Sequence, residues 1–98
     1  MPSEFLLGDC HTHLDQYAPG EMPEILDRAN EAGVAFVVVA GTTVQSTKDC
    51  IDMSEKYAPL YAGVGIHPME AHEIVTDETY AELKVLAKSS SKGVCISE

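Results

Sequence analysis

An unbroken apolar stretch over 34–40, VAFVVVA, is the clearest feature of the hydrophobic pattern. A run rich in β-branched residues and without polar positions is typical of a strand covered on both faces, as in parallel sheets. Shorter apolar runs predict further strands over 5–7, 60–66 and 94–98. The chain is therefore expected to contain a largely buried sheet.

Helical spacing of apolar residues predicts a helix between the first two of these strands. Ile25, Ala29 and Ala32 lie on one stripe of a helix over 23–32. Gly33 follows its last turn, at a position that favours glycine. The pattern changes from helical to extended at this residue.

Capping signals predict two more helices. Thr42 and Gln45 have the spacing of a capping box, which would begin a helix that runs to about Tyr57. Thr76 is a suitable N-cap for a helix that runs to about Lys88, and the acidic residues after it suit the positive end of a helix. The buried stripe of this last helix is expected to consist of Tyr80, Leu83 and Ala87.

Strands and helices thus alternate in the order βαβαβαβ. This order implies right-handed crossovers and parallel strands, so the predicted fold class is α/β. The 98 residues suffice for one small domain over 1–98, and they contain no internal repeat and no linker.

Composition narrows the functional classes. Lys and Arg number 6 against 16 Asp and Glu, which gives a formal net charge of −10. Such a chain repels polyanions overall, so a nucleic-acid substrate would need a local cationic centre, which a metal site could supply. The hydrophobic content of 45% is that of a globular protein.

The sequence contains no signal for a membrane or for export. No run approaches the roughly 18 apolar residues of a membrane span, and the opening MPSE lacks the basic start and apolar stretch of a signal peptide. Cys10, Cys50 and Cys95 are odd in number and far apart, which argues against a disulfide framework. We expect a cytoplasmic protein whose cysteines pack in the core.

The string DCHTHLD over 9–15 is the most informative chemical feature of the chain. In an extended strand, side chains two residues apart point to the same face, so His11 and His13 could present nitrogens to one cation. Asp9 or Asp15 could hold the non-ligating ring nitrogen and fix the tautomer. The alternative is that both histidines are merely solvated near the end of a strand.

Other polar residues follow later predicted strands. His67 comes after the third strand and Glu98 ends the fourth, so both are expected at the same sheet edge as His11 and His13, where α/β proteins bind ligands. A carboxylate there could bridge two cations. The alternatives are an exposed turn histidine at 67 and a solvated acid at 98, and His72 is interpreted as a solvated loop residue.

Taken together, three separated strings resemble the N-terminal part of the TatD family of metal-dependent hydrolases. They are DCHTHLD over 9–15, AGVGIHP over 62–68 and GVCISE over 93–98. The first string also occurs in other amidohydrolase-like and phosphoesterase families, whereas the three in order are more specific. The resemblance covers essentially the whole chain.

The resemblance implies a TIM-like (β/α) barrel with a two-metal centre, often that of a deoxyribonuclease. By similarity, His11 and His13 would ligate one metal, Glu98 would bridge both, and His67 would lie beside the substrate phosphate. The divalent ions would be zinc, manganese or magnesium. They would activate a water for attack on phosphorus, and the substrate would be DNA or another phosphoester.

Length is the main departure from the family pattern. A complete barrel needs about 250 residues, and this chain supplies three and a half βα units. The family's later ligands, two histidines and an aspartate, are absent, and Met69 stands where many members have a histidine after the His-Pro pair. We therefore expect an N-terminal portion of the barrel, with one metal or none bound and little nuclease turnover by itself.

Two other interpretations stay open at this point. One is a stand-alone partial barrel without catalysis, whose open sheet edges would favour self-association. The other is an amidohydrolase or a phosphoesterase of small molecules. A carbamylated lysine at the end of the fourth strand would favour an amidohydrolase, but Glu98 occupies that position.

Overall fold

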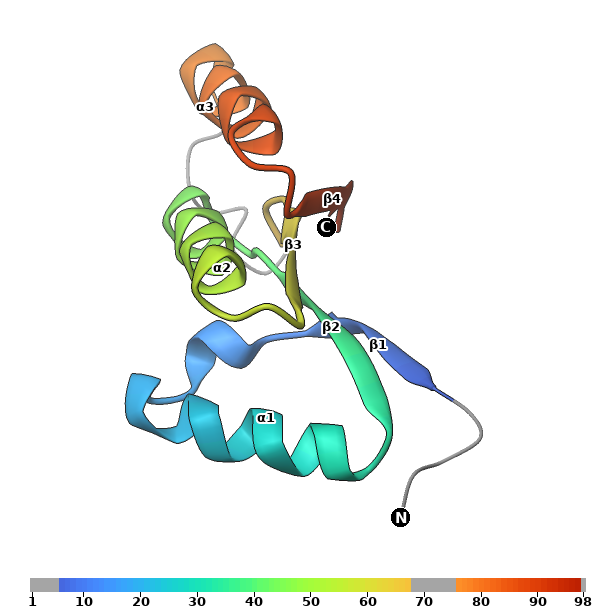
Figure 1. Ribbon diagram of the computed structural model, residues 1–98. Coiled ribbons are helices and arrows are strands. Elements are labelled where there is room, and N and C mark those ends of the chain that lie inside the picture. The colour runs from blue at the N-terminus through green and yellow to red at the C-terminus, as the bar shows by residue number, and fades with distance from the viewer. Residues whose placement is uncertain (1–5, 68–75, 98) are drawn as a thin grey trace.

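The computed structural model describes residues 6–67 and 76–97, so the predicted site residue Glu98 lies outside the described part. Strands and helices alternate along it (Figure 1). The strands are β1 (Leu7–Thr12), β2 (Val34–Ala40), β3 (Leu60–Val64) and β4 (Gly93–Ile96), and the helices are α1 (Met22–Glu31), α2 (Val44–Lys56) and α3 (Asp77–Lys88). Two 3₁₀ turns, Leu14–Gln16 and Pro19–Glu21, connect β1 to α1.

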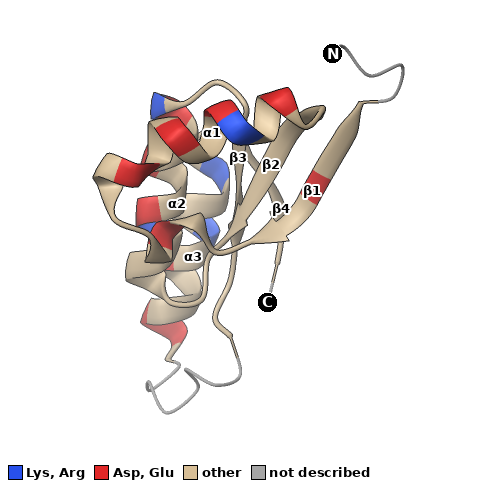
Figure 2. Cartoon of the chain, turned by 90° about the horizontal axis from the view of Figure 1, so that it is seen from below, with Lys and Arg blue, Asp and Glu red and all other residues tan. Residues whose placement is uncertain are grey.

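The strands form one parallel sheet in the order β1-β2-β3-β4. The helices lie along one side of this sheet, and no described helix covers the other side (Figure 2). Sequential parallel strands with every crossover helix on the same side are the arrangement of a (β/α) barrel, not of an open sheet with helices on both sides. The predicted parallel α/β fold, a partial barrel, is confirmed.

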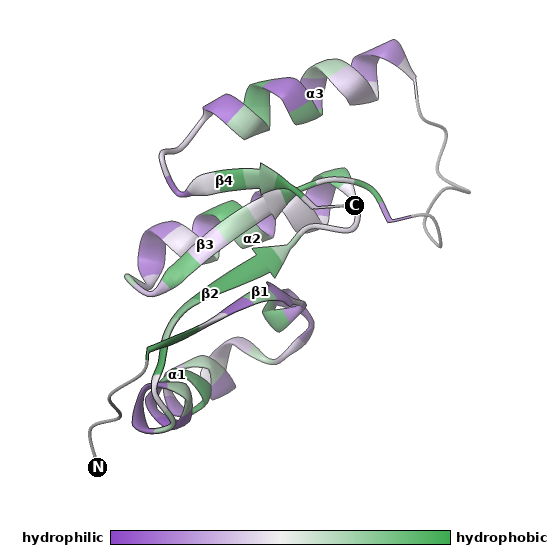
Figure 3. Cartoon of the chain, turned by 90° about the vertical axis from the view of Figure 1, so that its right-hand side faces the viewer, coloured by the Kyte–Doolittle hydropathy of each residue, from purple (hydrophilic) through white to green (hydrophobic). Residues whose placement is uncertain are grey.

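The core lies between the sheet and the helices. Val39 and Leu60 are fully buried there, and Ile51 of α2 is 4% exposed. Figure 3 shows β2 as the most continuously hydrophobic strand, in agreement with its apolar sequence. The buried cluster consists of Leu14, Met22, Val37, Val39, Cys50, Ile51, Leu60 and Ala62.

The other side of the sheet carries apolar side chains without a described covering element. The Phe36 ring packs edge-to-face against Tyr61, with 6.4 Å between ring centroids. These two residues, with Val38 and Val94, line an open depression of about 340 Å³. The expected self-association of the chain through its open sheet stays a prediction.

The first strand differs from its prediction. The apolar residues 5–7 were expected to form it, but β1 begins at Leu7 and continues through the polar residues to Thr12. Pairing with β2 explains this, because Thr12 lies opposite Val39 and its hydroxyl donates to the Val38 carbonyl at 2.9 Å. Cys10 and Cys95 are exposed, so their assignment to the core was wrong, whereas Cys50 is buried as expected.

Helix ends agree with most of the capping predictions. Gly33 has φ of 88° after α1, and Thr76 caps α3 by accepting a hydrogen bond from the Thr79 amide. The N-cap of α2 is Thr43, not the predicted Thr42, since its side chain accepts from the Ser46 amide. Gln45 belongs to the first turn of α2, where its side chain donates to Asp49 Oδ1.

The outer surface is acidic and partly apolar. Acidic residues are spread over the helices, as the red segments of Figure 2 show. Tyr80 on α3 is 67% exposed, so it does not belong to the buried stripe that was predicted for this helix.

Among the described helices, none has the length and apolar content that a membrane crossing requires. The cytoplasmic location stays a prediction.

Close packing of α2 against the sheet depends on Gly41. A Cβ atom at this position would lie 2.2 Å from Thr47 Oγ1 and 2.9 Å from Thr47 Cα. Thr47 is fully buried and exchanges hydrogen bonds with the Gly65 backbone, so it has no room to move away. The glycine therefore allows the first turn of α2 to approach the ends of β2 and β3.

We predict that Gly41→Ala lowers the free energy of unfolding by about 1–3 kcal/mol, the usual effect of overpacking a filled site. Urea denaturation followed by circular dichroism measures the change. Gly20→Ala is the control, because a Cβ atom there meets nothing within 4 Å. Equal stability of the two variants would contradict the packing described for Gly41.

Candidate metal centre

The two histidines of the DCHTHLD string lie side by side at the carboxyl end of β1. His11 is exposed within the strand, and His13 directly follows the strand and is half-buried. Their ring centroids are 5.1 Å apart, with the ring planes at 87°. The structure therefore brings together the two imidazoles that the spacing predicted to share one face.

A backbone carbonyl of β2 orients the second ring. His13 Nδ1 lies 3.2 Å from the Ala40 carbonyl oxygen. Since a carbonyl oxygen can only accept, Nδ1 carries a proton, and in the neutral ring Nε2 then keeps its lone pair. Metal-ligating histidines usually donate their other ring N–H in this way, which fixes both the tautomer and the ring orientation.

The carboxylates beside the histidines have other partners. Asp9 Oδ1 accepts from the His11 backbone amide at 3.3 Å, and Asp15 Oδ2 accepts from the Ser46 hydroxyl at 3.0 Å. For His13, neither acid is the ring partner, because Ala40 of the neighbouring strand has that role instead. For His11, the expectation that Asp9 or Asp15 holds a ring nitrogen stays a prediction.

His67 lies two residues beyond Gly65, after the end of β3. Its backbone amide donates to the Thr42 carbonyl at 2.8 Å, which ties the segment after β3 to the segment after β2. Over residues 6–67 and 76–97, no three His, Cys, Asp or Glu side chains come together as a metal site. The role of His67 beside a substrate phosphate stays a prediction.

The predicted bridging acid, Glu98, is not among the described residues, and neither are Pro68, Met69 and His72. The described chain ends at Ser97, whose backbone amide donates to the Val64 carbonyl at 3.0 Å. Its side chain lies against Gly63, because a Cβ atom on that glycine would be 2.6 Å from Ser97 Cβ. Residue 97 is therefore held at the carboxyl end of β3.

The donor chemistry of the histidine pair fits a divalent transition metal. Neutral imidazole is a good ligand for zinc and similar ions, and the Ala40 contact leaves the Nε2 lone pair of His13 available. Two imidazoles alone are fewer than the three or four protein ligands of a zinc site. A complete site would therefore need further donors.

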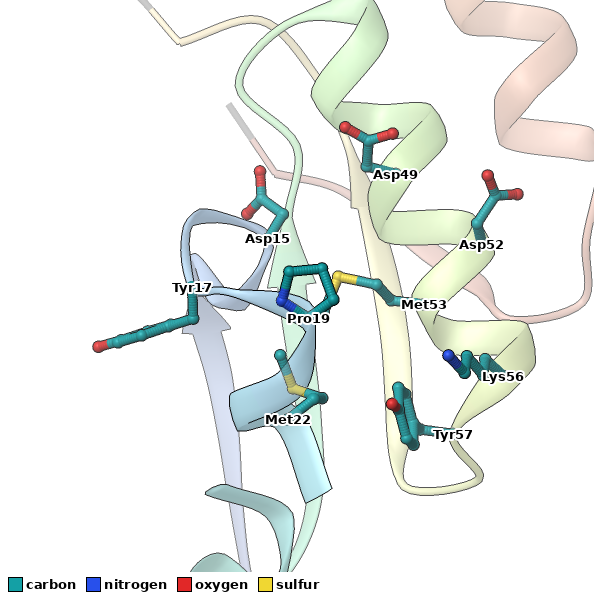
Figure 4. Close-up of a pocket in the computed structure, with 9 residues that line it drawn as sticks. All are labelled: Asp15, Tyr17, Pro19, Met22, Asp49, Asp52, Met53, Lys56 and Tyr57. Carbon is teal, nitrogen blue, oxygen red and sulfur yellow. The ribbon is translucent and has the colours of Figure 1, made fainter. Parts of the chain in front are cut away.

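A cavity of about 320 Å³ lies on the helix side of the sheet, between the turns after β1 and helix α2 (Figure 4). Met22 and Tyr57 help to line it, and the Met53 side chain points from α2 toward Pro19. Asp15 stands at the end of the cavity near the first turns of α2. None of the described histidines lines this cavity, so it is not the candidate metal centre.

The sequence pattern did not reveal three groups that support the site. The Ala40 carbonyl has no sequence signal, because every residue has one. Thr42 and Ser46 could have been found from the spacing of hydroxyl residues in GTTVQS, where Ser46 follows Thr43 by three residues and Thr42 by four, both of which allow pairing at the start of a helix. The sequence pattern indicated Thr42 only as the first residue of a capping box, and it did not indicate Ser46.

This chain is similar in sequence and in fold to known metal-dependent hydrolases. A profile of the family described as TatD related DNase matches residues 8–98. The metal-dependent hydrolase YjjV of Escherichia coli K12 is 33% identical over 94 residues, which cover 92% of this chain and 35% of YjjV. Its crystal structure superposes with a TM-score of 0.81, covering 94% of this chain and 36% of that one.

Two further relatives have similar extents. The metal-dependent hydrolase YabD of Bacillus subtilis 168 is 34% identical over 95 residues, covering 95% of this chain and 36% of YabD. The 3'-5' ssDNA/RNA exonuclease TatD of Edwardsiella piscicida is 27% identical over 71 residues, covering 71% of this chain and 27% of the exonuclease. This chain therefore spans about a third of the length of the relatives it matches.

We predict that neutral His13 carries its proton on Nδ1, because the Ala40 carbonyl requires a donor there. Long-range ¹H–¹⁵N correlation spectra of the neutral ring distinguish the two ring nitrogens. A protonated Nδ1 and an unprotonated Nε2 are expected. The opposite tautomer would show that the contact with Ala40 does not persist in solution.

We also predict a pH dependence of stability from Cys50. Burial, with a further contribution from the negative charge of Asp15, raises the pKa of this thiol from 9.0 to about 12. Between these values the unfolded chain releases a proton that the folded chain keeps, so stability falls as pH rises from 9 to 12. Urea denaturation at pH 8 and at pH 10.5 measures how much unfolding free energy each chain loses between these pH values. Cys50→Ala should lose less than the unchanged chain. An equal loss in both would contradict the raised pKa.

Proposed function

Because the chain belongs to the TatD family of related DNases, we propose that it supplies the first ligands of a divalent-metal centre in a phosphodiester hydrolase. The observation that carries this proposal is the pair of adjacent imidazoles at the carboxyl end of β1, one of them oriented by the Ala40 carbonyl. Ligands gather at this edge of the strands in (β/α) barrels. Family membership gives the class of reaction, metal-dependent hydrolysis.

The proposed residue roles follow the strand ends. His11 and His13 would hold one metal ion through one ring nitrogen each, and Glu98 would bridge it to a second ion. When bound, such ions polarise a phosphoryl oxygen and lower the pKa of a coordinated water toward neutrality. His67 would lie beside the substrate phosphate, at a position fixed by its backbone bond to Thr42.

Nucleic acid is the proposed substrate class. The name of the Edwardsiella relative supports this, since that protein is a ssDNA/RNA exonuclease. The net charge of −10 opposes binding of a polyanion, so the approach of a phosphodiester depends on the cations at the histidine edge. Of the two nucleic acids, we propose DNA as the substrate, because the family is described as TatD related DNase.

The part of the barrel that residues 1–98 form determines how much of the proposed metal site they can supply. The chain provides the strands β1 to β4 of a barrel, about a third of the length of its relatives. We propose that residues 1–98 form the N-terminal portion of that barrel. With at most part of the ligand set present, the 98-residue chain is expected to bind metal weakly and to show little turnover of DNA.

We predict that the chain binds Zn²⁺ or Mn²⁺ and that His11→Ala and His13→Ala each lower the affinity by at least about tenfold, a loss that even outer-shell changes cause in metal sites. Isothermal titration calorimetry with the metal alone measures this. His72→Ala is the matched control, because the proposal gives that histidine no ligand role. A similar loss with His72→Ala, or no loss with His13→Ala, would contradict the assignment.

A further inference from the structure

The Ser46 hydroxyl, on the first turn of α2, contacts two segments of the candidate site at once. It donates to Asp15 Oδ2 at 3.0 Å and accepts from the Thr42 backbone amide at 3.0 Å. Thr42 Oγ1 lies 3.4 Å from the same oxygen. A hydroxyl has one donor and two acceptor positions, so it can serve both segments at once. The Cys50 thiol, one turn further along α2, also lies close to this hydroxyl.

The first contact reaches the histidine pair. Asp15 is two residues after His13, in the 3₁₀ turn Leu14–Gln16, and its neighbour Leu14 is buried in the core. The second oxygen of Asp15, Oδ1, is buried and has no N–H or O–H donor among the described residues. Among the described residues, Ser46 is the hydroxyl that donates to this carboxylate, and the Cys50 thiol is a second side chain of α2 close to it.

The second contact reaches the segment after β3. Thr42 donates to Ser46 through its backbone amide, and its carbonyl accepts from the His67 amide at 2.8 Å. The amide and the carbonyl belong to the same residue, Thr42. The bond from its amide to Ser46 therefore also helps to orient the carbonyl that binds His67. A hydrogen-bonded chain thus runs from Asp15 through Ser46 and Thr42 to His67.

We propose that Ser46 is a positioning residue that couples the His11–His13 pair to His67 through Asp15 and Thr42. The inference rests on the proposed metal-binding role of the histidine pair. Ser46 contacts neither a metal nor a substrate. It holds the two segments that follow β1 and β3 at a fixed separation, because the rigid start of α2 carries the oxygen to which both are bonded.

The cap of α2 gives this oxygen a fixed place. The Ser46 backbone amide donates to Thr43 Oγ1 at 3.0 Å, and the next residue, Thr47, is fully buried against Gly65. Backbone and side chain of Ser46 are therefore both held. A residue without the hydroxyl would keep the helix cap but lose the link between the two segments.

Titration of the chain with Zn²⁺ alone tests the proposal. Ser46→Ala should weaken zinc binding by about 10- to 100-fold, as outer-shell changes do in metal sites, and Ser46→Thr, which keeps a hydroxyl, should restore most of the affinity. Ser54→Ala is the matched control. Ser54 is on the same helix and is 1% exposed, and among the described residues its hydroxyl donates to the Ile51 carbonyl within that helix.

Amide chemical shifts of the metal-free chain provide a second readout that does not depend on zinc. Ser46→Ala should shift the amide resonances of both the 13–16 segment and His67, whereas Ser54→Ala should shift neither. Shifts confined to one segment, or unchanged zinc affinity in a Ser46→Ala chain that shows both shifts, would overturn the coupling.

Failure of the proposed function would look different. If the unchanged chain binds no zinc, the metal assignment fails, while the amide shifts still decide whether Ser46 couples the two segments. If zinc binds and Ser46→Ala loses no more affinity than Ser54→Ala, the metal assignment stands and the positioning role is wrong.

Discussion

The carboxyl end of β2 is where the segments of the candidate site are joined. Ala40 orients the His13 ring through its carbonyl, and the Gly41 amide donates to the Gly63 carbonyl of β3. Thr42 binds the His67 amide, and Thr43 caps α2. Four consecutive residues therefore fix β1, β3 and α2 relative to one another, and each uses its backbone or a short side chain to do so.

This arrangement explains why the apolar strand β2 lies next to the polar residues of the candidate metal centre. Val37 and Val39 bury β2 against the helices, which places its carboxyl end rigidly at the sheet edge. A rigid neighbour can orient a ligating ring without a specialised side chain. The histidine pair itself is more exposed than the strand that supports it.

Much of the fold was predictable because it depends on local signals. The buried strand β2, the glycine after α1 and the cap at Thr76 each follow from residues that are neighbours in sequence. The bounds of β1 and the exposure of Cys10 were not predictable, since they depend on pairing with β2 and on what covers the opposite side of the sheet. The same holds for the site: the spacing of His11 and His13 predicted a shared face, whereas the partners of His13 and Asp15 come from β2 and α2.

We propose above all that His11, in β1, and His13, directly after it, bind one cation together. X-ray absorption spectroscopy of the chain loaded with one equivalent of Zn²⁺ tests it most directly, because multiple scattering identifies imidazole ligands. The account predicts two imidazole nitrogens at about 2.0–2.1 Å from the zinc, and one in the His13→Ala chain. An unchanged imidazole count after both His11 and His13 are replaced by alanine would contradict it.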